Sequence, residues 1–459
     1  MSLWFLLVLS SCQYGGDDGA DTGVPRGPGI DITEPTDPDA VSPLVFAEGK
    51  VPTNLLMISV DTMRKGALGF YGGDAQTDFI DGLLAESVHL DDHMQCSSWT
   101  YPATTCTLMG RSHEANGYMP RLTQLQDPLP ADTELLAQWL DAAGFVSLIH
   151  SSNEWLSEKW GNVRGYDIDV NFGGNSVEAI DEASTVLLSE AEARGAERWF
   201  LHMHLLEPHA PYNPPEDYLE GIEDLPSVPF DLSSRDVQYD VNRDAFDDFP
   251  PETRAAIEAH LRFRYDADLA WTDDRLAQMF EVLDAKGMLD DTLVVFWTDH
   301  GEAFWEHGHQ THAWTLFPEE NDAVMAFWAR NLEPRAWEGP THAFDLVPTL
   351  LELYDVPVPE SVDGVALGRA VDDRLRYASV AARKGPVQLL RQGDDALYYT
   401  WRTGRLELFD LGEDPGATND LVDAEKARAQ ELWDAMKPWV VSMDPLLPAD
   451  APLLPQGFQ

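Results

Sequence analysis

The stretch that decides the fold is residues 54–62, Asn-Leu-Leu-Met-Ile-Ser-Val-Asp-Thr. Its apolar part, residues 55–60, predicts a buried strand that ends at Asp61. Similar apolar runs occur at 145–149, 199–204, 293–298 and 323–328, and helical patterns lie between them at 133–143, 177–193, 253–286 and 344–353. Strands that alternate with helices are typical of a parallel sheet covered on both faces. The sequence therefore predicts an α/β fold with a large, mostly parallel sheet.

The pattern changes after about residue 372. Short strand-like runs at 378–383, 387–391, 396–402 and 406–409 precede a helical stretch at 424–437. This order predicts a catalytic domain over residues 50–372, a small antiparallel subdomain over 373–445 and a tail over 446–459. Within the larger domain, residues 214–252 hold twelve acids, two bases and several prolines, which predicts a surface excursion that acts as a lid or rim.

The first residues are typical of an exported protein. The apolar run from Leu3 to Leu9 is far shorter than the ~20 residues that span a bilayer, so residues 1–11 are expected to be a signal peptide. Leu9-Ser10-Ser11-Cys12 resembles the lipobox of bacterial lipoproteins, which implies lipidation of Cys12 and anchoring in the cell envelope. The alternative is an ordinary or uncleaved leader with an incidental cysteine. Residues 12–49, rich in Gly, Asp, Pro and Thr, are expected to form a disordered acidic tether.

The charge balance excludes some classes of partner. The 459 residues include 30 Lys+Arg and 80 Asp+Glu, a formal charge of −50, which argues against binding to nucleic acid or to anionic lipid through basic residues. Contact with a membrane is expected only through the lipid anchor. The two remaining cysteines, Cys96 and Cys106, could pair in an oxidising compartment or stay as buried free thiols.

Candidate site residues follow the strands. Asp61, Asp299-His300 and Glu207-Pro208-His209 come after separate apolar runs, and ligands of open α/β sheets sit at the carboxyl ends of strands. Carboxylates and a histidine gathered there could hold a hard divalent cation. Thr100 precedes a predicted helix with Pro102 in its first turn, where an anion is favoured. A hydroxyl beside a metal is a plausible nucleophile, whereas the simpler interpretation of Thr100 is a helix N-cap.

With these residues, the chain resembles the sulfatase family within the alkaline-phosphatase-like superfamily. The resemblance runs from about residue 52 to 440, and its motifs are 54–62 with 68–72, 98–110, 207–212, 289–302, 306–309 and 407–416. It implies an alkaline-phosphatase-like sandwich and a small C-terminal subdomain.

The resemblance also implies roles for individual residues. Asp61, Asp299 and His300 stand where the family binds one divalent metal, usually calcium, with manganese or magnesium in relatives. Thr100 stands at the position of the nucleophile, which completes the metal ligands. His209 and His312 stand where the family contacts the ester oxygens or the leaving group. His307 and His309 are expected to shape the loop, and Glu302 and Arg111 to be structural, with Arg111 paired to a carboxylate.

The departures from the family's pattern concern the chemistry. Sulfatases proper carry a Cys or Ser that is oxidised to formylglycine, and Thr100 cannot form that aldehyde. Thr104 replaces the Arg of the same motif, Thr62 replaces a second metal-binding Asp, and 151–154 replace a basic Gly-Lys-Trp-His stretch. Relatives with a Thr nucleophile act on phosphoesters.

We therefore expect an exported, metal-dependent hydrolase that cleaves a sulfate, phosphate or phosphonate ester, or transfers that group. The anionic substrate is expected to be a sulfated or phosphorylated glycan or lipid. The alternative is a non-catalytic surface binding protein on a retained sulfatase fold.

Overall fold

The structure is a computed structural model that describes residues 41–117, 120, 128–170, 176–241, 246–383, 385–443 and 454–458. The expected signal peptide, Cys12 and most of the expected tether lie outside the described residues.

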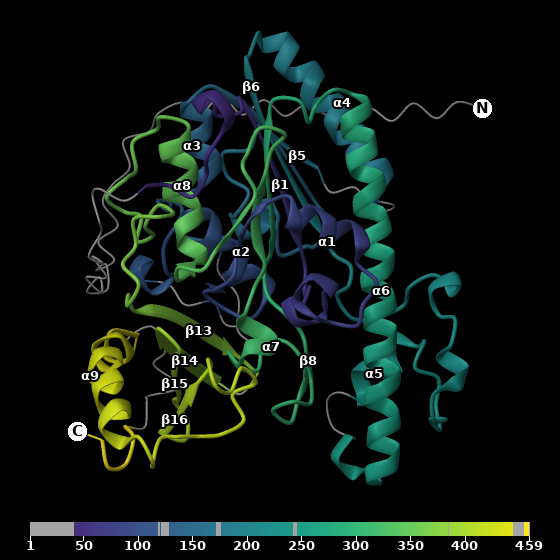
Figure 1. Ribbon diagram of the computed structural model, residues 1–459, viewed down its shortest axis with the longest axis vertical. Helices are drawn as coiled ribbons and strands as arrows, with labels where there is room; N and C mark the ends of the chain where they lie inside the picture. Colours follow the sequence, from purple (N-terminus) through teal and green to yellow (C-terminus); the bar gives the residue numbers. More distant parts are fainter. Residues whose placement is uncertain are drawn as a thin grey trace.

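An eight-stranded sheet forms the centre of the larger domain (Figure 1). Its order is β11 (Arg335–Trp337), β2 (Val88–Leu90), β10 (Met325–Trp328), β7 (Thr292–Thr298), β1 (Asn54–Val60), β6 (Arg198–Leu205), β4 (Phe145–Ser151) and β5 (Ile168–Val170). Strand β10 is antiparallel to both of its neighbours, and every other pairing is parallel. The predicted α/β fold with a mostly parallel sheet is confirmed.

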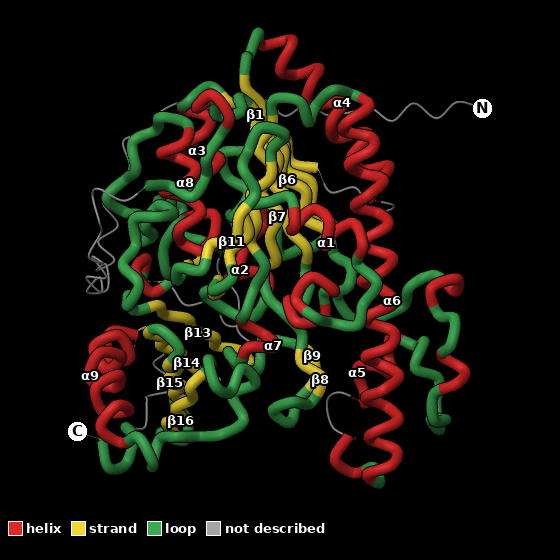
Figure 2. Tube along the Cα trace, in the orientation of Figure 1, coloured by secondary structure: helices red, strands yellow, loops and turns green. Residues whose placement is uncertain are grey.

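Helices cover both faces of this sheet (Figure 2). One face packs against α1 (Asp78–Ala85), α4 (Ser176–Arg194) and α6 (Pro251–Ala285), and the other against α2 (Thr100–Met109), α3 (Leu136–Ala142) and α8 (Leu346–Leu353). Strand β1 shows why: Leu56, Ile58 and Val60 join the first cluster, while Leu55 and Met57 join the second. Because side chains alternate along a strand, an unbroken apolar run suits a sheet buried on both faces.

The C-terminal subdomain is an antiparallel sheet with one long helix. Strands β13 (Arg376–Ala382), β14 (Gly385–Gln392), β15 (Asp395–Thr400) and β16 (Arg405–Asp410) pair in sequence order. Helix α9 (Lys426–Met443) packs on the face that carries Leu397 and Tyr399, while Tyr398 faces Trp99 of the larger domain. This matches the small antiparallel sheet and closing helix expected from the sequence.

Short elements complete the described chain. They are β3 (His93–Met94) paired with β12 (Thr341–His342), β8 (Ala303–Phe304) paired with β9 (Gln310–Thr311), α5 (Arg235–Asp240) and α7 (Pro318–Asn321).

The folded part begins earlier than the sequence suggested. Leu44 and Phe46 are buried in the core, and Phe46 forms a β-bridge with Leu332. The expectation of a disordered tether up to residue 49 is therefore wrong at its end, because these two apolar side chains have a place in the core.

The acidic excursion over 214–252 lies beside the lower half of α6 in Figure 1. Its ring of Phe246 stacks on Trp305, with 3.8 Å between ring centroids. Trp305 lies in the turn between β8 and β9, so the excursion contacts the hairpin that follows β7.

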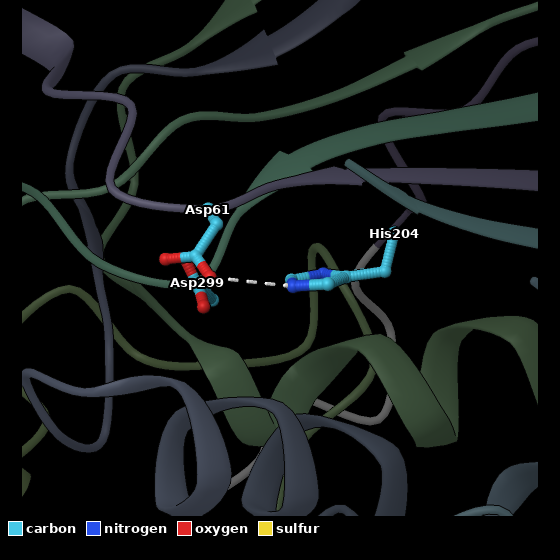
Figure 3. Close-up of side chains that lie close together, drawn as sticks. All are labelled: Asp61, His204 and Asp299. Carbon is cyan, nitrogen blue, oxygen red and sulfur yellow. Dashed lines mark ion pairs between the residues drawn. The ribbon is translucent and has the colours of Figure 1, made fainter. Parts of the chain in front are cut away.

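The strand ends bring chemical groups together. Figure 3 shows Asp61, His204 and Asp299, which come from the carboxyl ends of β1, β6 and β7. Because β1 lies between β6 and β7 in parallel register, these three ends share one edge of the sheet.

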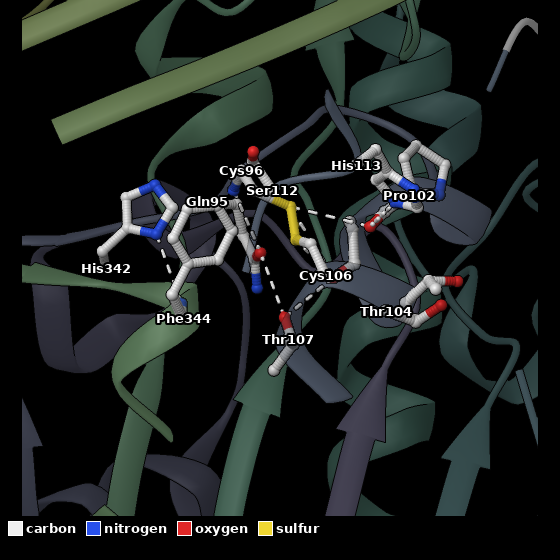
Figure 4. Close-up of a disulfide and its surroundings, with 12 residues drawn as sticks. Gln95, Cys96, Pro102, Thr104, Cys106, Thr107, Ser112, His113, His342 and Phe344 are labelled. Atoms are coloured by element: carbon white, nitrogen blue, oxygen red, sulfur yellow. Dashed lines mark hydrogen bonds between the residues drawn. A yellow bond between two sulfur atoms is a disulfide. The ribbon is translucent and has the colours of Figure 1, made fainter. Parts of the chain in front are cut away.

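A disulfide bonds helix α2 to the segment that precedes it in the chain. Cys106 of α2 is bonded to Cys96, so the two thiols that could have stayed free are paired (Figure 4). All ten residues of α2 are buried. Its threonines suit this position because the hydroxyls of Thr104 and Thr107 donate to backbone carbonyls four residues earlier, at 2.7 and 2.8 Å.

We predict that the disulfide stabilises the fold. Closing a loop with a sequence separation of 10 residues contributes about 2–3 kcal/mol to the free energy of unfolding, so the double variant Cys96→Ser/Cys106→Ser should melt a few degrees lower. Differential scanning calorimetry measures this. An equal melting temperature, with no linked peptide in an unreduced digest, would contradict the pairing.

A buried carboxyl in α6 predicts a dependence of stability on pH. Burial, and next the charge of Glu207, raise the pKa of Asp268 from 3.8 to about 8. A carboxyl with a raised pKa favours the folded state at low pH, and this contribution is lost as pH rises from 3.8 through about 8. Asp268→Asn should therefore raise the melting temperature at pH 8 and change it little at pH 4. The exposed control Asp217→Asn should leave the melting temperature unchanged at both pH values.

Candidate active site

Two buried carboxylates form the centre of the site. Asp61 and Asp299 are fully buried, and one oxygen of each, with a nitrogen of His204, lies within 4.8 Å of the others. Asp299 Oδ1 accepts hydrogen bonds from the backbone N–H groups of Thr62 (3.2 Å) and His300 (2.9 Å). The turns after β1 and β7 thus hold the Asp299 carboxylate in place.

His300 faces both carboxylates. Its Nε2 lies 3.6 Å from Asp61 Oδ1 and 3.6 Å from Asp299 Oδ2. Its Nδ1 lies 2.9 Å from the carbonyl oxygen of Gly301, which can only accept, so Nδ1 carries the proton. Burial lowers the pKa of His300, so the ring is neutral and Nε2 presents a lone pair to the carboxylates.

These residues fit a divalent cation. Asp61 Oδ1, Asp299 Oδ2, His300 Nε2 and Thr62 Oγ1 are buried polar atoms without a hydrogen-bond partner. Buried polar groups are normally satisfied, so this group of atoms needs an additional partner. Two carboxylate oxygens, a hydroxyl and an imidazole are suitable ligands for calcium, manganese or magnesium.

The electrostatics of the two carboxyls support the same conclusion. Burial opposes ionisation of Asp61, but the neighbouring His209, His204 and His300 outweigh it and lower the pKa of Asp61 to about 2. Burial, and next the charge of Asp61, raise the pKa of Asp299 well above its usual range. A second negative charge is thus unfavourable here without a cation between the carboxylates.

Thr100 faces this pair. Its hydroxyl donates to Asp61 Oδ2 at 3.4 Å, and Asn153 Nδ2 lies 3.4 Å from the same hydroxyl oxygen. The N-cap of α2 is Trp99, and Thr100 is the first helical residue. The alternative interpretation of Thr100 as an N-cap is therefore wrong: its side chain turns toward the carboxylates rather than the helix backbone.

Two positions that depart from the family's pattern have contacts of their own. Asn153, within the stretch that replaces the basic one, donates to Asp61 Oδ2 at 2.6 Å. Thr104, at the position of the expected Arg, bonds to the carbonyl of Thr100. The first substitution contributes a neutral donor to the site, and the second supports the backbone at Thr100.

The two expected substrate-facing histidines lie together at the rim. The rings of His209 and His312 are 5.0 Å apart, and His312 is 4.5 Å from the ring of His300. His312 Nδ1 lies 3.1 Å from Glu302 Oε1. Burial, and next the charges of His300, His209 and Arg383, lower the pKa of His312 well below its usual range. A neutral His312 that donates Nδ1–H to Glu302 keeps a lone pair on Nε2, so Glu302 orients a site residue as well as supporting the fold.

The other residues weighed from the sequence have structural contacts. His307 lies between Glu319 (2.6 Å) and the carbonyl of Ala417 (3.0 Å), and His309 bonds to Glu320 at 2.7 Å. Both histidines shape the loop, as expected. Arg111 Nε lies 3.9 Å from Asp363, the carboxylate partner that was expected without being named.

Sequence reasoning missed His204, Asn153 and the contact of Arg383. Asn153 follows the end of β4 by two residues, so the strand-end criterion could have found it. His204 lies inside a strand, and only the pairing of Ser59 with His204 places it beside Asp61. Arg383 comes from the C-terminal subdomain, and its backbone N–H donates to Ala313, next to His312, at 3.2 Å.

Comparisons with known proteins agree with this geometry. A family profile described as Sulfatase matches residues 53–356. The sulfatase YidJ of Escherichia coli, whose function is uncharacterized, is 23% identical over 81% of this chain and 83% of its own length. An arylsulfatase of Clostridium perfringens is 22% identical over 60% of this chain. That alignment spans 57% of the arylsulfatase, so the chain covers just over half of that relative's length.

Solved structures share the fold. A protein determined in complex with its substrate D-glucosamine-2-N,6-O-disulfate superposes with a TM-score of 0.66 at 16% identity, over 86% of this chain and 99% of the other. A phosphonate monoester hydrolase from Silicibacter pomeroyi superposes with a TM-score of 0.64 at 19% identity, over 86% and 96%. The profile spans all eight strands of the sheet and the strand ends that carry Asp61, His204 and Asp299, and the chain therefore belongs to the sulfatase family.

Proposed function

We propose that the protein is a metal-dependent hydrolase that cleaves an ester of sulfate, phosphate or phosphonate with Thr100 as nucleophile. The observation that carries this proposal is the position of Thr100. Thr100 is the first residue of a buried helix, and its hydroxyl points at Asp61. Four polar atoms without a hydrogen-bond partner, which suit a cation, belong to the same site.

The substrate's anionic group would sit between the metal ligands and the start of α2. A divalent cation, when bound by Asp61, Asp299, His300 and Thr100, supplies positive charge that polarises the ester and lowers the pKa of the hydroxyl. The backbone N–H groups at the N-terminus of α2 favour the same anion. Arg383 adds a cation near the rim, where its guanidinium lies 5.3 Å from the centroid of the Trp314 ring.

The reaction proceeds in two displacements. Thr100 Oγ1 attacks sulfur or phosphorus, and its proton passes to Asp61 Oδ2, its acceptor at 3.4 Å. The ester bond breaks, and the leaving oxygen takes a proton from His209, because a neutral His312 has no proton on Nε2 to give. Water then gives a proton to His209 and attacks the covalent ester of Thr100. The bond to Thr100 Oγ1 breaks, the product leaves, and Asp61 returns the proton that restores the hydroxyl.

The nucleophile favours phosphorus over sulfur. A threonine cannot form the aldehyde hydrate that releases sulfate by elimination, so a threonine sulfate ester must be attacked by water directly. One structural neighbour supports chemistry on phosphorus, the phosphonate monoester hydrolase above. A multifunctional alkaline phosphatase superfamily protein of Trinickia caryophylli is 26% identical over 39% of this chain. A sulfated glycan remains the second candidate, because one structural neighbour was solved with a disulfated glucosamine.

Turnover of model esters tests the proposal. Purified protein should hydrolyse at least one of nitrophenyl sulfate, nitrophenyl phosphate and nitrophenyl phenylphosphonate, and EDTA should abolish the activity until calcium or manganese is restored. Thr100→Ala should lower kcat/KM by at least about a thousandfold, because the group that forms the covalent bond is gone. Thr100→Ser keeps a hydroxyl and should retain measurable activity.

Thr107→Ala is the matched control on the same helix, because its hydroxyl bonds to Ala103 and Gln95 rather than to the site. Activity that persists in EDTA, or in Thr100→Ala, would refute the mechanism. Binding of a sulfate or phosphate ester without turnover of any would favour the non-catalytic binding protein.

We also propose that the protein is exported and anchored by a lipid on Cys12. The disulfide between Cys96 and Cys106 suits an oxidising compartment, which supports export. As a separate observation, none of the helices among the described residues is both long and apolar enough to cross a bilayer. When cells that express the protein are grown with a radioactive fatty acid, the protein should become labelled. The Cys12→Ala variant should carry no label. Equal labelling of the two proteins would exclude this anchor.

A further inference from the structure

A series of hydrogen-bonded polar side chains leads from Tyr166, through the interior of the sheet, to Asp61. The hydroxyl of Tyr166 lies 2.9 Å from His202 Nδ1, and His202 Nε2 lies 3.1 Å from Ser59 Oγ. Ser59 Oγ lies 2.8 Å from His204 Nδ1, and His204 Nε2 lies 3.6 Å from Asp61 Oδ2. Ser59, His202 and His204 are fully buried, and His204 Nε2 has no hydrogen-bond partner.

The sheet creates this series through its register. Ser59 pairs with His204 and Met57 with His202 in the parallel ladder between β1 and β6. Residues two apart on a strand share a face, so Ser59 lies on the face of Leu55 and Met57. That face packs against α2, the helix that begins with Thr100.

The hydrogen bonds have a direction. Ser59 has one hydroxyl proton, and its oxygen lies closer to the two imidazole nitrogens than to the carbonyl oxygen of Met203, which is 3.5 Å away. Burial, and next the charge of His204, lower the pKa of His202 to about 3, so its ring is neutral and carries one proton. A lone pair on His204 Nε2 would face the negative oxygen of Asp61, whereas an N–H there is attracted to it.

The arrangement that satisfies these conditions runs one way. Tyr166 donates to His202 Nδ1, His202 Nε2–H donates to Ser59, Ser59 donates to His204 Nδ1, and His204 Nε2–H points at Asp61. At 3.6 Å this last contact is an electrostatic attraction rather than a full hydrogen bond. Hydrogen bonds aligned in this way polarise one another, so the N–H dipole nearest the carboxylate is strengthened.

We propose that His204 is a positioning residue for Asp61, and that the series through Ser59 and His202 to Tyr166 sets its orientation and tautomer. His204 and Asn153 hold Oδ2 of the carboxylate, which leaves Oδ1 turned toward His300 and the proposed metal. An N–H donor on the Oδ2 side stabilises the ionised carboxylate and leaves Oδ1 for the cation. The inference rests on the proposed function, because it assumes that a metal binds there.

Metal affinity tests this role without any need for a substrate. Metal-stripped protein is titrated with Mn²⁺ or Ca²⁺ in a calorimeter. His204→Leu removes the donor and should weaken the Kd by about 10–100-fold, the usual effect of a partner that orients a metal ligand. Ser59→Ala keeps His204 but frees its tautomer, and should weaken the Kd by a smaller factor. His204→Gln places an amide N–H near the position of Nε2 and should recover most of the affinity.

Two control variants separate this role from folding. His342→Leu removes a buried histidine that bonds to the carbonyl of Tyr377, and Ser87→Ala removes a buried hydroxyl that bonds to Leu83. Both should lower the melting temperature of the metal-free protein and leave the Kd within about twofold of the wild type.

The outcomes are distinguishable. An unchanged Kd in His204→Leu, or no recovery in His204→Gln, would overturn the inference. A loss beyond about a thousandfold would also overturn it, because His204 would then bond to the metal directly. If the wild-type protein binds neither metal, the proposed function itself fails; if it binds metal and His204→Leu binds it equally well, only this inference fails.

Discussion

The rest of the site depends on two carboxylates that are buried side by side without a cationic side chain bonded to either of them among the described residues. Asp61 and Asp299 end adjacent parallel strands, β1 and β7, so the topology of the sheet forces them together. Two like charges in a medium of low dielectric constant are unfavourable, and the rise in the pKa of Asp299 has this repulsion as its second cause after burial. The fold keeps the pair because its hydrogen bonds hold one oxygen of each carboxylate and leave the other oxygen for a cation.

The donors around this pair are neutral. Backbone N–H groups hold Asp299, an amide holds Asp61, and His300 and His312 have lowered pKa values. A lysine or arginine bonded to these carboxylates would compete with a metal, so a neutral surrounding suits a site that has to accept one. At 151–154, where the sulfatase pattern has a basic stretch, Asn153 supplies a directed hydrogen bond to Asp61 instead of a charge.

Much of the fold and part of the site could be predicted from the sequence, for one physical reason. Apolar runs such as 55–60 and 293–298 indicate strands buried on both faces. Residues just after parallel strands of this kind meet at one edge of the sheet, so Asp61, Asp299 and His300 could be predicted to lie together. His204 could not be found in this way, because a histidine inside a strand is indistinguishable from a core residue until the register with β1 is known. The start of the folded part was also missed, because Leu44 and Phe46 form too short an apolar pattern to indicate burial.

The overall charge of −50 opposes the approach of the proposed anionic substrate, and the site offers local attraction against it. Electrostatic interactions between exposed charges are screened within about 10 Å at 0.1 M salt. The acidic surface therefore repels an anionic group only weakly once that group lies inside the rim. Within that range the substrate would meet the metal, the N-terminus of α2 and Arg383, all positive or partly positive. Arg383 is carried by the C-terminal subdomain, whereas the proposed metal ligands follow the strands of the sheet. In the proposed reaction, attraction of the substrate and activation of Thr100 would therefore come from different parts of the chain, and a change in the hairpin between β13 and β14 would alter which anionic ester is accepted while the proposed metal site stays the same.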